Sequence, residues 1–174
     1  IYKRLTTPMV KYDYTYWSSP VANQSLTAFS PGTNSTKFYQ WNTTINNWQF
    51  YNGVMQPGKG YIVRAPDAFT TTPQQFQGVF TGVPNNGTIT TPILWSAASD
   101  LNLIGNPYPS AIDADLFLSN PANAAILDAT IYLWTHNSPI NANVYAQNDY
   151  ASYNFLGGVG AAATRVGRRP HADP

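Results

Sequence analysis

The chain has 174 residues, a length that fits one domain with a single hydrophobic core. Only 10% of the residues are charged and the formal net charge is +1, so no broad basic field is available for nucleic acid. The sequence contains no cysteine and no run of about 18 apolar residues, which excludes disulfides, thiolate metal sites and a membrane-spanning helix. We therefore expect no nucleic-acid partner, no membrane insertion and no cofactor.

Short segments rich in aromatic residues and threonine alternate between polar and apolar positions, which predicts β-strands. In the clearest segment, YDYTYW at 12–17, alternation places Tyr12, Tyr14 and Tyr16 on one face. Asn52-Gly53 follows a strand at 48–51 and predicts a hairpin turn, with the returning strand beginning at 54–55. Further strands are expected at 36–41, 60–65, 76–80, 87–95, 101–104 and 130–134. The pattern predicts an all-β fold, an antiparallel β-sandwich that is jelly-roll-like or Ig-like.

One short helix is expected, from Ser110 to Ser119. Ser110 is the predicted N-cap, and Asp113 and Asp115 suit the positive N-terminal end of the helix dipole. The side expected to be buried carries Ile112, Leu116 and Phe117.

The composition changes near the C-terminus. From Gly157 the chain becomes rich in glycine and alanine, and it then ends in an arginine-rich segment. We therefore expect a β-sandwich module at 1–158, followed at 159–174 by a linker and tail that is either natural or the product of truncation or cloning.

Six segments in chain order resemble a module of Bacteroidota surface proteins that are exported by the type IX secretion system. They are YDYTYWSSPV (12–21), PGKGYIVRAP (57–66), GVPNNGTIT (82–90), NLIGNPYPSAIDADLFL (102–118), IYLWTHN (131–137) and DYASYN (149–154). The resemblance covers roughly residues 8–158. It implies a non-catalytic β-rich part of an adhesin-like protein, located outside the cell or on the bacterial surface, and it carries over no catalytic residue.

The segment GVMQPGKG at 53–60 matches the phosphate-binding loop of nucleotide-binding proteins up to its final position. That loop needs serine or threonine after the lysine and a helix behind it, whereas Gly60 is followed by strand-like residues. Pro57 and Gly58 therefore predict a turn rather than a nucleotide site.

Candidates for metal binding or catalysis are few. Asp113, Asp115 and Asp128 are the alternative metal ligands, but calcium needs about six oxygen ligands and this set does not supply them, so no metal is expected. A secreted hydrolase of polysaccharide or ester would rely on an Asp pair or on His136, the one histidine before the tail. No serine lies in a Gly-x-Ser-x-Gly elbow that would support such a reaction.

The aromatic residues carry the leading hypothesis, because flat rings stack on sugar faces while amides bind sugar hydroxyls. Trp41 and Trp48 flank a polar connection and are the predicted ligand-binding tryptophans, together with Tyr39, Asn46 and Asn47. Trp17, Trp95 and Trp134 are assigned to the core.

Three functions remain open on the sequence alone. The first is an extracellular recognition or adhesion module that binds a polysaccharide or cell-surface glycan without catalysis. The second is the small hydrolase, and the third is a structural spacer within a large surface protein.

Overall fold

The computed structural model describes residues 1–97, 99–138, 140, 145 and 149–161. The chain divides into two compact units, Ile1–Ile112 and Asp113–Pro174, which we call unit 1 and unit 2. The boundary that the sequence predicts after residue 158 stays a prediction, and residues 162–174 of the expected tail lie outside the described residues.

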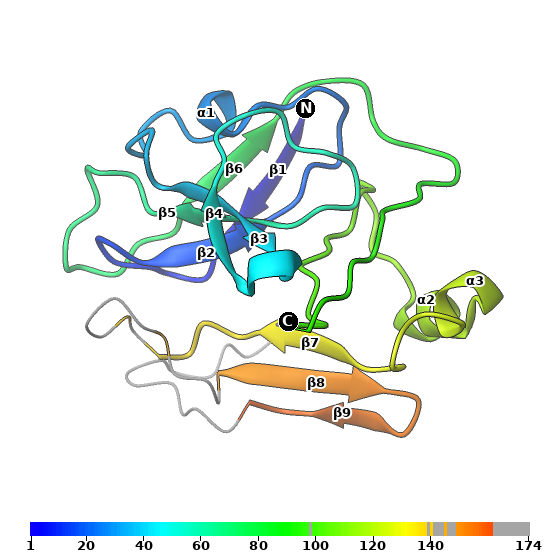
Figure 1. The fold of residues 1–174 in the computed structure, drawn as a ribbon. Coiled ribbons are helices and arrows are strands. Elements are labelled where there is room, and N and C mark those ends of the chain that lie inside the picture. The colour runs from blue at the N-terminus through cyan, green and yellow to red at the C-terminus, as the bar shows by residue number, and fades with distance from the viewer. Residues whose placement is uncertain (98, 139, 141–144, 146–148, 162–174) are drawn as a thin grey trace, which may run out of the picture. The chain divides into compact units, whose positions relative to one another are not determined.

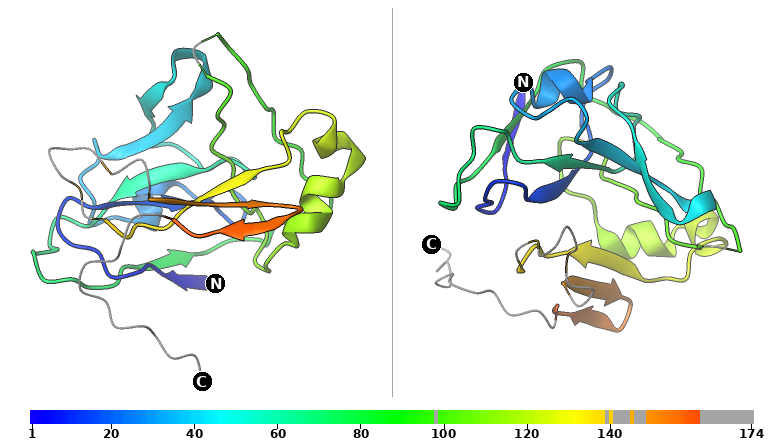
Figure 2. Two further views of the ribbon diagram at one scale, coloured as in Figure 1. Left: turned by 90° about the horizontal axis from the view of Figure 1, so that it is seen from below. Right: turned by 60° about the vertical axis from the view of Figure 1, so that its left-hand side comes forward.

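Unit 1 contains two antiparallel sheets (Figure 1). The smaller one pairs β1 (Tyr2–Leu5) with β6 (Gln77–Phe80). The larger one has four strands in the order β2 (Tyr14–Trp17), β5 (Tyr61–Arg64), β3 (Phe38–Asn42) and β4 (Asn47–Phe50). Two short helices complete the unit, α1 (Leu26–Phe29) and the single 3-10 turn η1 (Thr43–Ile45), which joins β3 to β4 (Figure 2).

The described residues of unit 2 form one antiparallel sheet of three strands and two short helices (Figure 1). The helices are α2 (Ala114–Ser119) and α3 (Pro121–Ala124). The strands are β7 (Ile131–Trp134), β8 (Tyr150–Asn154) and β9 (Gly157–Val159), with β8 in the middle.

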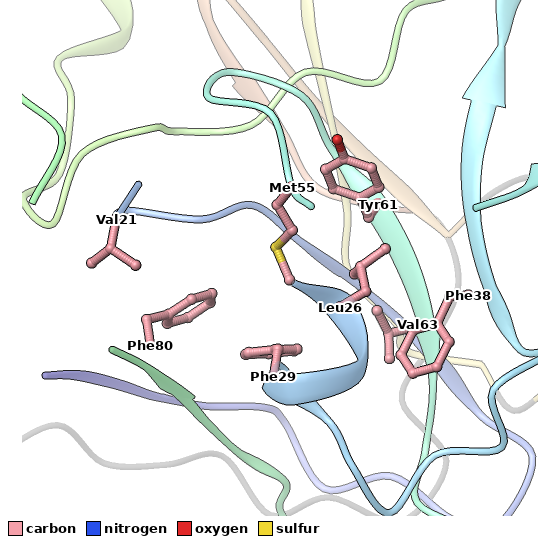
Figure 3. Packing of buried hydrophobic residues seen from close by; sticks show 8 residues of the cluster. All are labelled: Val21, Leu26, Phe29, Phe38, Met55, Tyr61, Val63 and Phe80. Carbon is pink, nitrogen blue, oxygen red and sulfur yellow. The ribbon is translucent and has the colours of Figure 1, made fainter. Parts of the chain in front are cut away.

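The fold is all-β and sandwich-like, as the sequence predicts, with short antiparallel strands and few short helices. In unit 1, one cluster of buried side chains joins the two sheets and α1 (Figure 3). Trp17 of β2 packs against this cluster, with its ring 4.8 Å from that of Phe29. The cluster consists of Val21, Leu26, Phe29, Phe38, Met55, Tyr61, Val63 and Phe80.

The hairpin predicted at Asn52-Gly53 is not formed. β4 pairs with β3 instead, so the hairpin turn lies between Asn42 and Asn47. The Gly53 carbonyl accepts a hydrogen bond from the Leu26 amide, which ties the Asn-Gly segment to the start of α1. A contact with a distant segment has therefore overridden a strong local turn signal.

The predicted helix begins later than expected. Ser110 lies before the helix, and the N-cap is Asp113, whose carboxylate accepts a hydrogen bond from the Leu116 amide at 3.0 Å. Asp115 occupies the first turn, where the helix dipole favours its charge. The buried side chain of α2 is Leu118. Of the three residues predicted to be buried, Phe117 is half-buried, whereas Ile112 and Leu116 are exposed, so the prediction was wrong for those two.

No strand forms over 87–95, which corrects the assignment of Trp95 to the core. Gly87 has a φ of 69°, and Pro92 lacks the amide that a central strand would use. Without a sheet face to bury it, Trp95 is 78% exposed.

Candidate functional site

One face of the four-stranded sheet in unit 1 is aromatic. Residues that are directly opposite in neighbouring strands share a face, and Tyr39 lies opposite both Ile62 and Phe50. Tyr39 also lies 6.3 Å from the ring of Tyr14, whose pKa is raised by burial and by the neighbouring Tyr39. The rings on this face are those of Tyr14, Tyr16, Tyr39, Trp41, Trp48 and Phe50. The core cluster lies on the other face, through Phe38, Tyr61 and Val63.

Trp41 and Trp48 form a cross-strand pair at the end of the β3–β4 hairpin. They are directly opposite in the register, and their rings meet edge to face with centroids 5.2 Å apart. The Trp48 ring also lies 5.9 Å from Tyr16 of β2. Both tryptophans are half-buried, so each residue keeps part of its surface exposed. The structure thus brings together the two tryptophans that the sequence singles out.

A second segment is fastened to this hairpin. The Leu101 carbonyl accepts hydrogen bonds from Trp41 Nε1 at 3.0 Å and from Thr43 Oγ1 at 2.7 Å. Ser96 Oγ donates to the Thr43 carbonyl at 3.0 Å. Three side-chain hydrogen bonds therefore hold residues 94–97 and 99–102 against the end of β3 and η1.

Trp95 lies on this fastened segment, next to Ser96. It is 78% exposed, whereas the other four tryptophans are half-buried. Leu94 and Leu101 on the same segment are also exposed, as is Ile45 of η1. We call Trp41, Trp48 and Trp95, with η1 and residues 94–97 and 99–102, the tryptophan corner. It carries three of the five tryptophans in the chain.

Amide side chains surround the hairpin end. Asn46 adopts a left-handed conformation with a φ of 48° and is exposed, as is Asn47, whose Oδ1 accepts the Trp48 amide at 2.7 Å. On the opposite face from the tryptophan pair, Gln49 Oε1 accepts hydrogen bonds from Gln40 at 3.3 Å and from Asn42 at 3.2 Å. The hairpin therefore has an aromatic face and an amide face.

The exposed position of Trp95 was not predicted from the sequence. Its alternating neighbours suggested a strand, and the bonds that fix its segment come from residues more than 50 positions away. The one local hint is the pair of serines at 96 and 99, whose backbones bridge each other in a tight turn.

The aspartates proposed as alternative metal ligands serve other roles. Asp113 caps α2, and Asp115 accepts a hydrogen bond from Tyr153 at 2.8 Å, which is the main cause of the raised pKa of Tyr153. Asp128 is exposed. In the described part of the chain, no group of three or more His, Asp, Cys or Glu side chains comes close enough to hold a metal ion.

His136 lies in unit 2, with a φ of 49°, against the rings of Trp134 and Tyr145 at 5.0 and 5.7 Å. The nearby hydroxyl of Ser138 donates to the buried carboxylate of Asp149 at 2.9 Å. Asp149 therefore organises the turn that carries His136. The hydrolase alternative stays a prediction.

A family model for a domain of unknown function, DUF8693, matches residues 1–169. The chain belongs to this family. The DUF8693 match spans both compact units. No curated protein and no solved structure matches the chain. No helix among the described residues is both long and apolar enough to cross a membrane.

Proposed function

We propose that this domain recognises carbohydrate and breaks no bond. The observation that carries the proposal is the tryptophan corner, where the half-buried pair of Trp41 and Trp48 lies beside a segment that exposes Trp95. Tryptophan rings stack on the CH faces of sugars, and exposed amides such as those of Asn46 and Asn47 bind sugar hydroxyls. The corner supplies both chemistries.

The rigidity of the corner supports this function. The hydrogen bonds that join Trp41 and Thr43 to Leu101, and Ser96 to Thr43, hold the two segments together within the domain itself. A ligand that binds a prearranged surface loses less free energy to ordering that surface. The corner therefore suits a recognition site better than two free loops would.

The proposed setting is outside the cell or on the bacterial surface, in an adhesion role with a polysaccharide or cell-surface glycan as the partner. Its support is the resemblance to exported surface modules, together with a chain that has few charges and no cysteine. On the same grounds we propose that the protein is exported by the type IX secretion system.

The test is retention on a panel of immobilised polysaccharides. Trp48→Ala and Trp95→Ala should each weaken retention about tenfold, equal to roughly 1.4 kcal/mol of binding free energy. Phe155→Ala serves as the matched control, because Phe155 is 53% exposed and belongs to unit 2, which contains none of the corner residues. That variant should bind as the parent does.

Two results would count against the proposal. Parent protein that is retained on no glycan would favour the spacer function. Retention that survives both tryptophan substitutions would place the sugar site elsewhere on the domain.

A further inference from the structure

Unit 1 contains a surface pocket of about 330 Å³ that the tryptophan corner does not include. This volume lies at the lower end of the range for small-molecule sites, roughly 300–1,000 Å³. One wall is the turn that ends at Lys59, and the other is an extended segment that ends at Pro92. The lining residues are Gln56, Pro57, Lys59, Ile89, Thr90, Thr91 and Pro92.

The first wall is fixed from several sides. The backbone amide of Gln56 donates a hydrogen bond to the buried Tyr61 hydroxyl at 2.8 Å, and the backbone amide of Gly105 donates one to the Gly58 carbonyl at 3.0 Å. Lys59 forms a β-bridge with Ile104. The turn therefore keeps its shape without a ligand.

The second wall is joined to the first by close packing. Thr91 Oγ1 donates to the Pro57 carbonyl at 3.3 Å. Gly58 has a φ of 79°, and a Cβ at this position would lie 1.9 Å from Thr91 Oγ1. A glycine is thus required where the two walls meet.

The charge in the pocket is positive. Lys59 is exposed, and the lining contains no aspartate. The ion pair between Arg64 and Asp67 does not include Lys59 and involves none of the lining residues. An ammonium group of this kind attracts a carboxylate or sulfate.

The remaining lining residues match a sugar ring. Thr90 and Gln56 are exposed and offer a hydroxyl and an amide to ligand hydroxyls, while Pro57, Ile89 and Pro92 offer apolar surface to CH groups. A nucleotide fits poorly, because Lys59 precedes Gly60 and strand β5 where a phosphate-binding loop needs serine or threonine and a helix.

We propose that the pocket at Lys59 is a second sugar-binding site, specific for a residue that carries a negative charge, a uronic acid or a sulfated sugar. Lys59 binds the charged group, and Thr90 and Gln56 bind ring hydroxyls. The inference rests on the proposed function, since it assigns an acidic class of glycan to a domain that recognises carbohydrate.

The test is titration of the whole domain with glucuronate, glucose 6-sulfate and glucose, followed by the backbone amide signals of Lys59, Thr90 and Thr91. We expect one or both acidic sugars to shift these signals and to bind more tightly than glucose. Lys59→Gln should weaken that binding about tenfold or more, since it removes a charge-assisted hydrogen bond. Lys3→Gln is the control, because Lys3 is exposed on β1 and does not line the pocket.

The outcomes separate this inference from the proposed function. Loss of neutral-glycan retention in Trp48→Ala, with acidic sugars bound no better than glucose, would overturn the Lys59 site and leave the tryptophan corner in place. If Lys59→Gln and Lys3→Gln weaken the binding of acidic sugars equally, the binding depends only on the overall charge of the domain, and the Lys59 site would also be overturned. Acidic-sugar binding that depends on Lys59, in a domain whose retention survives Trp48→Ala and Trp95→Ala, would support the pocket and refute the corner.

Discussion

Trp41 and Trp48 face each other directly across the β3–β4 ladder, with ring centroids 5.2 Å apart. The two rings pack together at the end of the hairpin, and the hydrogen bond from Trp41 Nε1 to the Leu101 carbonyl joins this end to a neighbouring segment. The same rings that are proposed to bind sugar therefore also stabilise the surface on which they lie.

Trp41→Ala should lower the free energy of unfolding by about 1–3 kcal/mol, less than the roughly 3–5 kcal/mol of a fully buried tryptophan. The reason is that the substitution removes both the ring contact with Trp48 and the hydrogen bond to Leu101. Urea denaturation measures the difference. Trp95→Ala is the comparison and should stay within about 0.5 kcal/mol of the parent, because its ring is exposed. Equal stability of the two variants would contradict a structural role for Trp41.

Tyr61→Phe should cost about 1–2 kcal/mol, although it removes a single oxygen from the core. The Tyr61 hydroxyl accepts a hydrogen bond from the backbone amide of Gln56 at 2.8 Å, and phenylalanine would leave that amide without this acceptor. Burial is the main cause of the raised pKa of Tyr61. Thermal unfolding followed by calorimetry measures the loss.

Tyr51→Phe is the matched control for that experiment. Tyr51 stacks on Tyr61 with ring centroids 5.5 Å apart, and its hydroxyl donates to the Val54 carbonyl at an exposed position. Water replaces an exposed partner at little cost, so this variant should lose less stability than Tyr61→Phe. The reverse order would show that the Gln56 amide does not depend on Tyr61.

Gly58→Ala should destabilise unit 1 by about 1–3 kcal/mol, through a positive φ and a clash with Thr91 Oγ1. Gly87→Ala separates the two causes, because Gly87 also has a positive φ but no atom within 4 Å of an added Cβ. Its cost should be limited to about 1 kcal/mol. Adding Thr91→Ala to Gly58→Ala should recover part of the loss, and chemical denaturation of the single and double variants measures it. A double variant no more stable than Gly58→Ala would exclude the clash as a cause.

The class of the fold could be predicted from sequence because alternation and aromatic content report strand formation locally. Phe38–Asn42, Tyr61–Arg64 and Gln77–Phe80 were all expected within one or two residues. The β3–β4 connection also lies where the sequence analysis places a polar connection, between Trp41 and Trp48.

The predictions that were wrong concern features that depend on contacts between segments distant in sequence. The hairpin predicted at Asn52-Gly53 does not form, and the Gly53 carbonyl instead accepts a hydrogen bond from the Leu26 amide. Trp95 was assigned to a strand over 87–95, which does not form. The pocket at Lys59 was missed because its second wall, at Ile89 to Pro92, lies about 30 positions further along the chain. Local periodicity does not contain this information.

The side chain of Asp149, in unit 2, is fully buried. Burial alone would raise the pKa of this carboxyl, but hydrogen bonds from the Thr135 hydroxyl and from the backbone and hydroxyl of Ser138, with the Asn137 amide, lower it overall. A carboxyl whose pKa is lower in the folded state stabilises the fold at every pH above its ordinary value of about 3.9. That contribution is lost as the pH falls through the lower folded pKa.

Asp149→Asn should therefore weaken the turn at 135–138 by about 1–3 kcal/mol at pH 7, because an amide group cannot accept from all of these donors. Hydrogen exchange of the Asn137 and Ser138 amides reads this turn directly, and both should exchange faster in the variant. The difference from the parent should shrink below about pH 4, where the carboxyl takes up a proton in the open or unfolded state, and it should be lost once the pH falls below the lower pKa of the folded state. Asp128→Asn, at an exposed position in the same unit, should change neither amide. A gap between parent and Asp149→Asn that stays constant from pH 7 to pH 2 would show that the charge of Asp149 does not stabilise this turn.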